Sequence, residues 1–319
     1  MNEGAVSPAH SGGSRERLII GCGYLGIRVA SLWKRLGHNV TVLTRSADRA
    51  REFEEQGLAA IVGDITSPST LTRLPAAQTV LFAVGLDRGS GKSQREVFVT
   101  GLRNVLERIA LSTARFIYVS STSVYGQSQG EWVDETSICN PLRANGQVCL
   151  EAESVVWDYF PNAAELVAGD EPPPRAANVL RLAGIYGPGR LLARLEAIRS
   201  GAAITDNPEG YLNLIHVDDA AAAVLACEKR GRPGEIYLVS DDAPLPRIAY
   251  YAALAKLAGA PAPTFSGLDP SDAKIGNLNK RCRNRKIHDE LQLTLQYPTF
   301  EIGLPHAMTV PAAGEELPG

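Results

Sequence analysis

The sequence predicts an α/β protein with a doubly wound parallel sheet and a smaller C-terminal region that binds substrate. From Arg17 onward, short apolar runs alternate with segments of helical period, and a glycine-rich turn follows the first run. Beyond about residue 190 this rhythm loosens. Short strands that alternate with helices indicate crossover units and a parallel sheet. Right-handed crossovers then give a doubly wound fold.

Each expected element has its own local signal. The run at 17–21 is apolar and ends in glycine, and 24–37 places Leu25, Val29 and Leu32 on one helical face. The β-branched run 39–44 is typical of a strand. The later expected elements are, in chain order, a helix at 48–57, strands at 58–64 and 79–85, a helix at 101–111, a strand at 115–121, a loop at 168–177, a strand and turn at 178–189, a helix at 190–201, a strand at 235–240 and a helix at 248–259.

Composition narrows the class of protein. Of 319 residues, 45% are apolar and 21% charged, which excludes disorder, collagen and a coiled coil for the chain as a whole. The net charge of −3 argues against nucleic acid as a partner. No apolar run reaches the ~18 residues that span a bilayer, so no membrane partner is expected. Five scattered cysteines without a CxxC pair indicate neither disulfides nor a metal site, and a reducing, cytoplasmic setting fits them.

The chain is expected to have a tail at each end. Residues 1–14 lack bulky apolar groups and have no signal-peptide pattern, and 305–319 are similar. We assign 15–190 to the nucleotide-binding domain, with 211–230 returning to it. The smaller substrate-binding region then comprises 191–210 and 231–304.

The turn Gly21-Cys22-Gly23-Tyr24-Leu25-Gly26 is a GxGxxG motif. Alone it is weak, because a turn that binds nothing also uses glycine. Here it follows the first strand and opens a helix, which is the context of a dinucleotide site. Gly21 permits the tight turn, Gly23 lets a pyrophosphate approach, and Gly26 lets the helix pack on the strand. The helix N-terminus then faces the anion.

The end of the second strand indicates which dinucleotide binds. It carries Thr44-Arg45-Ser46 and no acidic residue for the ribose hydroxyls of NAD. An arginine there suits a 2′-phosphate, so NADP is favoured over NAD, although a solvated Arg45 is the alternative. Asp64 is a candidate for the adenine amino group, or a helix cap. The end of the 79–85 strand adds Ala83, Val84 and Gly85 to the expected cofactor site.

Five motifs together resemble the short-chain dehydrogenase/reductase superfamily, in its extended branch, the NAD-dependent epimerase/dehydratase family. The similarity runs from Arg17 to Gly303. It implies a Rossmann domain with a small C-terminal substrate domain, and transient oxidation at a sugar carbon by bound NAD(P), followed by epimerisation, dehydration or reduction. The motifs are GCGYLG, IYVSSTSVYG, LRLAGIYGPG, IHVDDAAAAV and EIYLVSDDAPLP.

The resemblance implies a catalytic Ser/Thr, Tyr and Lys, of which only the first is found. Ser121 occupies the Ser/Thr position, although such hydroxyls also satisfy backbone groups at strand ends. The Tyr and Lys belong to a YxxxK motif, in which the lysine lowers the pKa of the tyrosine that moves the proton. This chain has no YxxxK, and Asn145 and Cys149 stand at the two positions. Neither replaces a general base or a fixed positive charge.

Three interpretations stay open. The protein is an atypical enzyme in which Tyr125 or Tyr186 donates a proton, although Tyr125 is also typical of packing. Alternatively Cys149 acts as a thiol, although a free cysteine is more often inert. The third is a catalytically silent sensor or regulator that reads cofactor level. The enzyme interpretation predicts an oxidoreductase or epimerase that acts on a nucleotide-sugar or polyol-like substrate, and the resemblance is compatible with a homodimer.

Further polar residues have simpler expectations. His216 lies in a strand-like run and is expected to be structural, and Asp218 and Asp219 are expected to cap the next helix. Arg181 is expected to be a buried structural residue. Five cations lie among the seven residues from Lys280 to Lys286. They fit a solvated, flexible loop, or a site for a phosphorylated or nucleotide-linked substrate.

Overall fold

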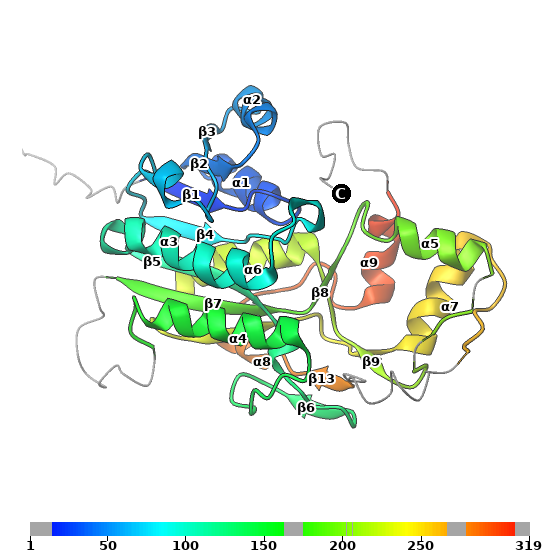
Figure 1. Ribbon diagram of the computed structural model, residues 1–319. Helices are drawn as coiled ribbons and strands as arrows, with labels where there is room; N and C mark the ends of the chain where they lie inside the picture. Colours follow the sequence, from blue (N-terminus) through cyan, green and yellow to red (C-terminus); the bar gives the residue numbers. More distant parts are fainter. Residues whose placement is uncertain (1–14, 163–174, 202, 206, 267–278, 310–319) are drawn as a thin grey trace, which may run out of the picture.

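A seven-stranded, fully parallel sheet forms the centre of the protein, in the order β11-β7-β5-β4-β1-β2-β3 (Figure 1). The computed structural model describes residues 15–162, 175–201, 203–205, 207–266 and 279–309. The strand order reverses between β1 and β4, which is where such sheets bind nucleotides at their carboxyl ends. The strands are β1 (Glu16–Ile20), β2 (Asn39–Thr44), β3 (Ala59–Val62), β4 (Thr79–Phe82), β5 (Arg115–Ser121), β7 (Ala176–Leu182) and β11 (Ile236–Val239). The predicted doubly wound α/β fold is confirmed.

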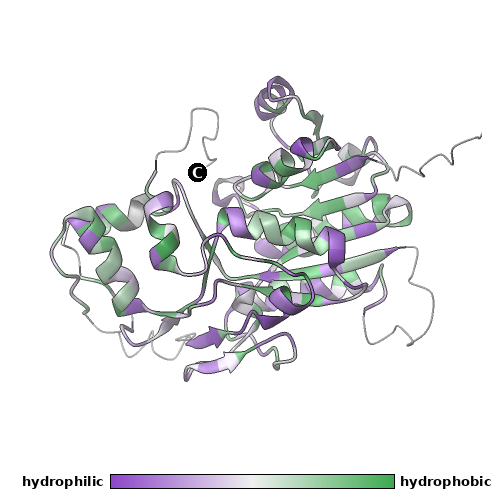
Figure 2. Ribbon diagram, turned by 180° about the vertical axis from the view of Figure 1, so that it is seen from behind, coloured by the Kyte–Doolittle hydropathy of each residue, from purple (hydrophilic) through white to green (hydrophobic). Residues whose placement is uncertain are grey.

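Helices cover both faces of this sheet because each strand is apolar on both sides. On one face α1 (Gly26–Arg35), α6 (Val217–Arg230) and α8 (Arg285–Asp289) pack on residues such as Ile19 and Leu180. On the other face α3 (Gly101–Ile109) and α4 (Ala144–Trp157) pack on residues such as Leu18 and Phe116. The buried strands are accordingly hydrophobic along their length (Figure 2). The helix α2 (Ala47–Glu55) joins β2 to β3.

A second, smaller core lies beside the carboxyl ends of the strands. It is built by α5 (Leu192–Arg199), α7 (Arg247–Ala258) and α9 (Phe300–Ala307), which lie together on one side of the molecule (Figure 1). Short two-stranded sheets connect it to the main body. They pair β8 (Gly184–Tyr186) with β10 (Leu214–His216), β9 (Tyr211–Leu212) with β12 (Leu245–Pro246), and β6 (Glu131–Val133) with β13 (Lys280–Cys282).

Three expectations need correction. The strand at 235–240, which we assigned to the smaller region, forms β11 at the edge of the central sheet, because its apolar residues pair with β7. The helix α9 continues through Pro305 to Ala307, inside the segment expected as a tail, because Leu304 and Ala307 are buried in the smaller core. The rest of the domain division stays a prediction.

The third correction concerns the basic segment 280–286. It is no flexible loop in the structure, because it forms β13 and the start of α8, and Lys280 and Cys282 are buried. The expected tail at 1–14, most of the loop at 168–177 and residues 310–319 lie outside the described residues. Within the part of the chain that is described, no helix combines the length and apolar character needed to cross a membrane.

Candidate functional site

The glycine turn between β1 and α1 is closed towards the protein and open on one side. Gly21 has φ +92°, and a Cβ there would lie 2.6 Å from the backbone nitrogen of Val84. A Cβ on Gly26 would lie 2.6 Å from the carbonyl oxygen of Gly21. A Cβ on Gly23 would meet nothing within 4 Å. The turn therefore leaves space at the one glycine where a pyrophosphate has to approach, and this geometry fits a dinucleotide.

Tyr24 fixes the turn to the loop that follows β8. Its hydroxyl donates to the carbonyl oxygen of Pro188 at 3.0 Å. The guanidinium carbons of Arg28 and Arg190 each lie 4.4 Å from the centre of its ring. Arg28 pairs with Asp218 at 3.1 Å, whereas Arg190 is exposed. Tyr24 and its neighbour Leu25 are themselves buried, so the turn is held by packing as well as by glycine.

The end of β2 presents Arg45 to solvent beside an acidic partner. Arg45 Nη2 lies 2.8 Å from Asp87 Oδ2, and both side chains are about half exposed. The hydrogen bond from Arg45 lowers the pKa of Asp87 below its usual range. Ser46 caps α2 by accepting from the nitrogen of Arg49, and its own nitrogen donates to Thr44 Oγ1. Arg45 is therefore available to a ligand once Asp87 is displaced.

Asp64 lies after β3, and its carboxylate already has partners within the protein. Its carboxylate accepts from the nitrogen and the hydroxyl of Thr66 and pairs with Lys92 at 2.8 Å. Burial opposes its ionisation, but these bonds hold its pKa below the usual value. At the end of β4, Ala83 donates to the carbonyl of Ile20, and a Cβ on Gly85 would meet nothing within 4 Å.

Ser121 lies at the carboxyl end of β5, the strand next to β4 in the central sheet. It is partly buried, and its hydroxyl accepts from the nitrogen of Ser123 at 3.1 Å. The hydroxyl hydrogen stays available to a substrate oxygen, because this bond uses only a lone pair. Ser120 differs, since it is buried and donates to Glu153 at 2.6 Å.

Tyr125 does not meet the requirements of a proton donor. Its side chain is fully buried, and its hydroxyl accepts from Arg181 Nη1 at 3.0 Å. Burial raises the pKa of its phenol. Arg181 is in turn bound by both oxygens of Glu153, at 3.0 and 2.7 Å. The expected packing role fits this geometry, so the catalytic role is withdrawn, and Arg181 is buried as expected.

Asn145 and Cys149 follow one stripe of α4 that leads into the core. Asn145 is exposed, Cys149 is half-buried, and Glu153, one turn further, is buried. Ser123 Oγ lies 3.8 Å from Cys149 Sγ, and burial raises the pKa of this thiol. At neutral pH the sulfur is therefore protonated, which makes it a poor nucleophile.

Tyr186, the second candidate phenol, is also buried. Only 2% of its surface is exposed, and its hydroxyl has no hydrogen-bond partner among the described residues. Its ring packs edge-on against His216. Burial raises its pKa. A buried phenol that is hard to ionise is better suited to packing than to proton transfer.

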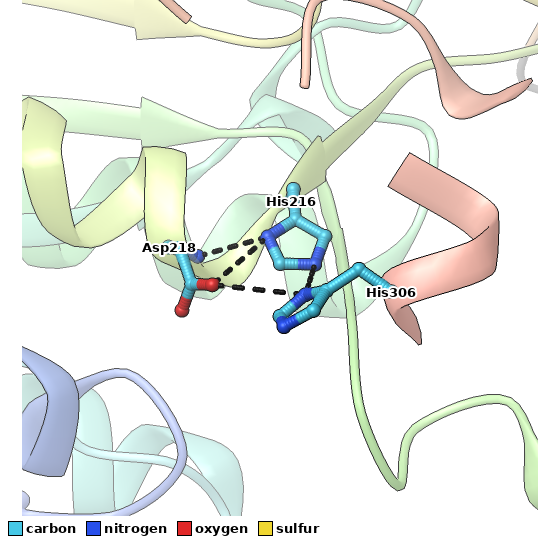
Figure 3. A group of neighbouring side chains, drawn as sticks. All are labelled: His216, Asp218 and His306. Atoms are coloured by element: carbon cyan, nitrogen blue, oxygen red, sulfur yellow. Dashed lines mark hydrogen bonds and ion pairs between the residues drawn. The ribbon is translucent and has the colours of Figure 1, made fainter. Parts of the chain in front are cut away.

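His216 begins a chain of polar groups that reaches α9 (Figure 3). It is fully buried, and its Nδ1 accepts from the nitrogen of Asp218 at 3.2 Å. The ring proton is therefore on Nε2, which faces Nδ1 of His306 at 3.1 Å. Together with Asp218, these two imidazoles are close enough to one another to ligate a metal ion. A histidine that binds metal through one ring nitrogen normally keeps its proton on the other, but Nδ1 of His216 already accepts a hydrogen bond. A hydrogen-bond chain therefore fits this group better than a metal ion.

The expected caps of α6 are replaced by His216. The side chain of His216 caps the helix, while Asp219 accepts from the nitrogens of Gln296 and Tyr297 at 2.7 and 2.9 Å. Asp219 therefore holds the segment before α9 against α6. Sequence reasoning had no signal for this, because the partners are backbone groups 77 and 78 residues away.

The comparisons with known proteins agree with this architecture. The family model described as "NAD dependent epimerase/dehydratase family" matches residues 18–240. The protein YeeZ of Escherichia coli K12 is 29% identical over 287 residues, which cover 88% of this chain and 95% of that protein. A 3-diazoavenalumate denitrifying reductase of a Streptomyces species is 26% identical, over 76% of this chain and 80% of the relative. The structure of a putative NAD-dependent epimerase/dehydratase from Methylobacillus flagellatus has a TM-score of 0.71 and 28% identity, over 91% of this chain and 96% of that one.

The family match spans well over half of the chain, so this chain belongs to the NAD-dependent epimerase/dehydratase family. The family binds a nicotinamide dinucleotide, and the structure supplies the glycine turn at the switch point of the sheet. Sequence reasoning missed Asp87, Lys92 and Arg190 near this crevice. Asp87 and Lys92 follow the 79–85 strand, and Arg190 directly follows the IYGPG turn at 185–189, so strand-end position was the available signal.

Proposed function

We propose that the protein is an NADP-dependent oxidoreductase or epimerase with a non-standard catalytic set, acting on a nucleotide-sugar or polyol-like substrate. The observation that carries the proposal is the open position at Gly23, within a turn whose other two glycines are tightly enclosed. When bound, the nicotinamide exchanges a hydride with the substrate. The chain's own part is to bind and orient both molecules.

The cofactor is held by residues at four strand ends. Gly21, Gly23 and Gly26 form the turn, with Tyr24 and Leu25 fixing it to the protein. Arg45, flanked by Thr44 and Ser46, binds the 2′-phosphate after exchanging Asp87 for it, because a guanidinium donates two bonds to a phosphate. The remaining cofactor contacts that we propose are Asp64, Ala83, Val84 and Gly85.

Ser121 is the substrate-contacting hydroxyl in this proposal. It lies at the end of β5 and retains a hydrogen to donate to a substrate oxygen. The Streptomyces relative is named as a reductase, and this supports hydride transfer from the cofactor to the substrate. Asn145 and Cys149 then shape the site and do not move protons, because neither ionises near neutral pH.

A catalytically silent dinucleotide-binding regulator is the second candidate. It is favoured by α4, where an exposed amide and a protonated thiol occupy the positions of the family's phenol and ammonium. Both candidate functions require the cofactor to bind. They differ in whether a hydride is transferred between the bound cofactor and a substrate.

Calorimetric titration with NADPH and NADH tests the proposal. The wild type is expected to bind NADPH at least tenfold more tightly, a difference of about 1.4 kcal/mol. Arg45→Asp is expected to lose that preference, whereas Arg51→Asp, with the same charge change on the exposed face of α2, keeps it. Equal affinities in the wild type would contradict the role of Arg45.

A second step separates the two candidates. Protein loaded with NADPH is mixed with a panel of sugar-derived aldehydes and ketones, and the absorbance of the reduced nicotinamide is followed. Oxidation in the presence of one compound supports an oxidoreductase, and Ser121→Ala is expected to slow it by about 10²- to 10³-fold. Because an epimerase returns its hydride, protein loaded with NADP⁺ is also incubated with nucleotide-sugars, and the products are tested for an epimer. Unchanged absorbance and no epimer, with tight binding intact, support the regulator.

A further inference from the structure

Lys280, on β13, is a buried cation. Only 5% of its surface is exposed. Its Nζ lies 3.3 Å from the carbonyl oxygen of Tyr125, which is the one hydrogen-bond partner that this ammonium has among the described residues. Cys282, two residues further along the strand, is buried against Tyr125 in the same cluster. Residues two apart in a strand share a face, so Lys280 points towards the end of the segment that begins with Ser121.

No acidic group neutralises this lysine in the described part of the chain. The other two buried cations differ, since Arg17 pairs with Glu228 at 2.5 Å and Arg181 pairs with Glu153 at 2.7 Å. Glu131 is in register with Lys280 on β6, but it is exposed and accepts from the nitrogen of Gln129. A buried ammonium without a counter-charge is costly, and ionisable groups in such surroundings cluster at functional sites.

The charged groups that face Lys280 from neighbouring elements are also cations. Burial lowers the pKa of Lys280 first, and Arg143 and Arg247 lower it further, while the Cys282 thiol opposes this. Arg143 directly precedes α4, whose first turn has no acidic residue, and Arg247 begins α7 in the smaller region. Lys280 therefore lies between α4 and α7, where the two regions of the protein meet.

We propose that Lys280 binds an anionic group of the substrate, a phosphate or a carboxylate. This inference rests on the proposed function, because it places the substrate beside the Ser121–Tyr125 segment. It also explains why the basic run of the sequence is folded into a strand: pairing β13 with β6 holds the first of its cations in the interior.

The test uses thermal unfolding of the full chain in inorganic phosphate or succinate, against sodium chloride at equal ionic strength. A ligand that binds only the folded state raises the melting temperature in a saturable way. The wild type is expected to show this for phosphate, succinate or both, and the responding anion identifies the chemistry. In Lys280→Met the apparent affinity for that anion is expected to fall at least tenfold.

The variants distinguish a ligand-binding role from a structural one. A lysine that binds ligand leaves an uncompensated charge in the free protein, so Lys280→Met is expected to melt at the same or a higher temperature without anion. Lys286→Met, which breaks the 2.5 Å pair with Glu235, is the matched control and keeps the anion response. Lys280→Arg retains the positive charge and is also expected to keep the anion response. A wild type without any anion response, or a Lys280→Met protein that responds like the wild type, would overturn the inference.

NADPH titration of the same preparations separates this inference from the proposed function. If Lys280→Met binds NADPH normally and has lost the anion response, both stand. If the wild type fails to bind NADPH, the proposed function falls while the anion result is still decided by the melting curves.

Discussion

The ion pair at the expected cofactor site and the ion pair that α4 makes with β7 differ in their exposure to solvent. At the end of β2, Arg45 and Asp87 form an ion pair in which both side chains are about half exposed. Between β7 and α4, Arg181 and Glu153 form a pair with 4% and 3% of their side chains exposed. An exposed pair is worth little and opens easily for a ligand, whereas a buried pair is committed to the fold. The comparison indicates that the Arg45–Asp87 pair can open for a ligand, whereas the Arg181–Glu153 pair stabilises the fold.

Replacing the buried carboxylate is expected to have the largest effect. Glu153→Gln leaves Arg181 buried without its counter-charge and puts an amide NH2 in place of one of the two oxygens that Arg181 binds, so the free energy of unfolding is expected to fall by about 3–5 kcal/mol. Urea denaturation measures this. Glu151→Gln is the control on the same helix, because its pair with Arg95 is exposed and is worth about 0–1 kcal/mol. Similar losses of unfolding free energy in both variants would mean that the buried pair contributes no more to stability than the exposed pair.

A pH titration sharpens the comparison at the boundary between the two regions. Burial lowers the pKa of His216 from 6.5 to about 4; Asp218 opposes this shift, and His306 and Arg28 add to it. The unfolded chain then takes up a proton before the folded one, so stability is complete above pH 6.5 and is lost as the pH falls towards 4. Between pH 6.5 and pH 5 the loss from this residue is expected to be about 2 kcal/mol. The check is the difference in unfolding free energy at the two pH values, in wild type and in His216→Phe.

The variant is expected to show less of this pH dependence, although its overall stability drops because the cap of α6 is lost. Equal slopes in wild type and His216→Phe would show that the buried imidazole is not the group that titrates.

Most of the fold followed from the sequence because it depends on local pattern. The strands near 17–21 and 39–44, the helix after Gly26 and the crossover order are specified by apolar period and by glycine, which act over a few residues. The strand at 235–240 was recognised, but its place in the central sheet was not, because pairing with β7 is a long-range choice. The same reason hid the end of α9, whose buried face exists only in the presence of the smaller core.

The site was predictable to the extent that backbone geometry decides it. Gly21, Gly23 and Gly26 have conformational and steric requirements that a motif records. Tyr125 and Lys280 were different, since nothing in the local sequence distinguishes a buried phenol from an exposed one, or a buried lysine from a solvated one. Their surroundings come from Arg181 and from the pairing of β13 with β6, which join residues far apart in the chain.

The most direct test of the account is a calorimetric NADPH titration of the wild type beside Gly23→Ala. The added methyl group meets nothing within 4 Å in the free protein, so the variant is expected to unfold at the same urea concentration as the wild type. It is nevertheless expected to bind NADPH at least tenfold more weakly, because the methyl group lies where the pyrophosphate approaches. Equal affinities in the two proteins, or no binding by the wild type, would contradict the claim that this turn is a dinucleotide site.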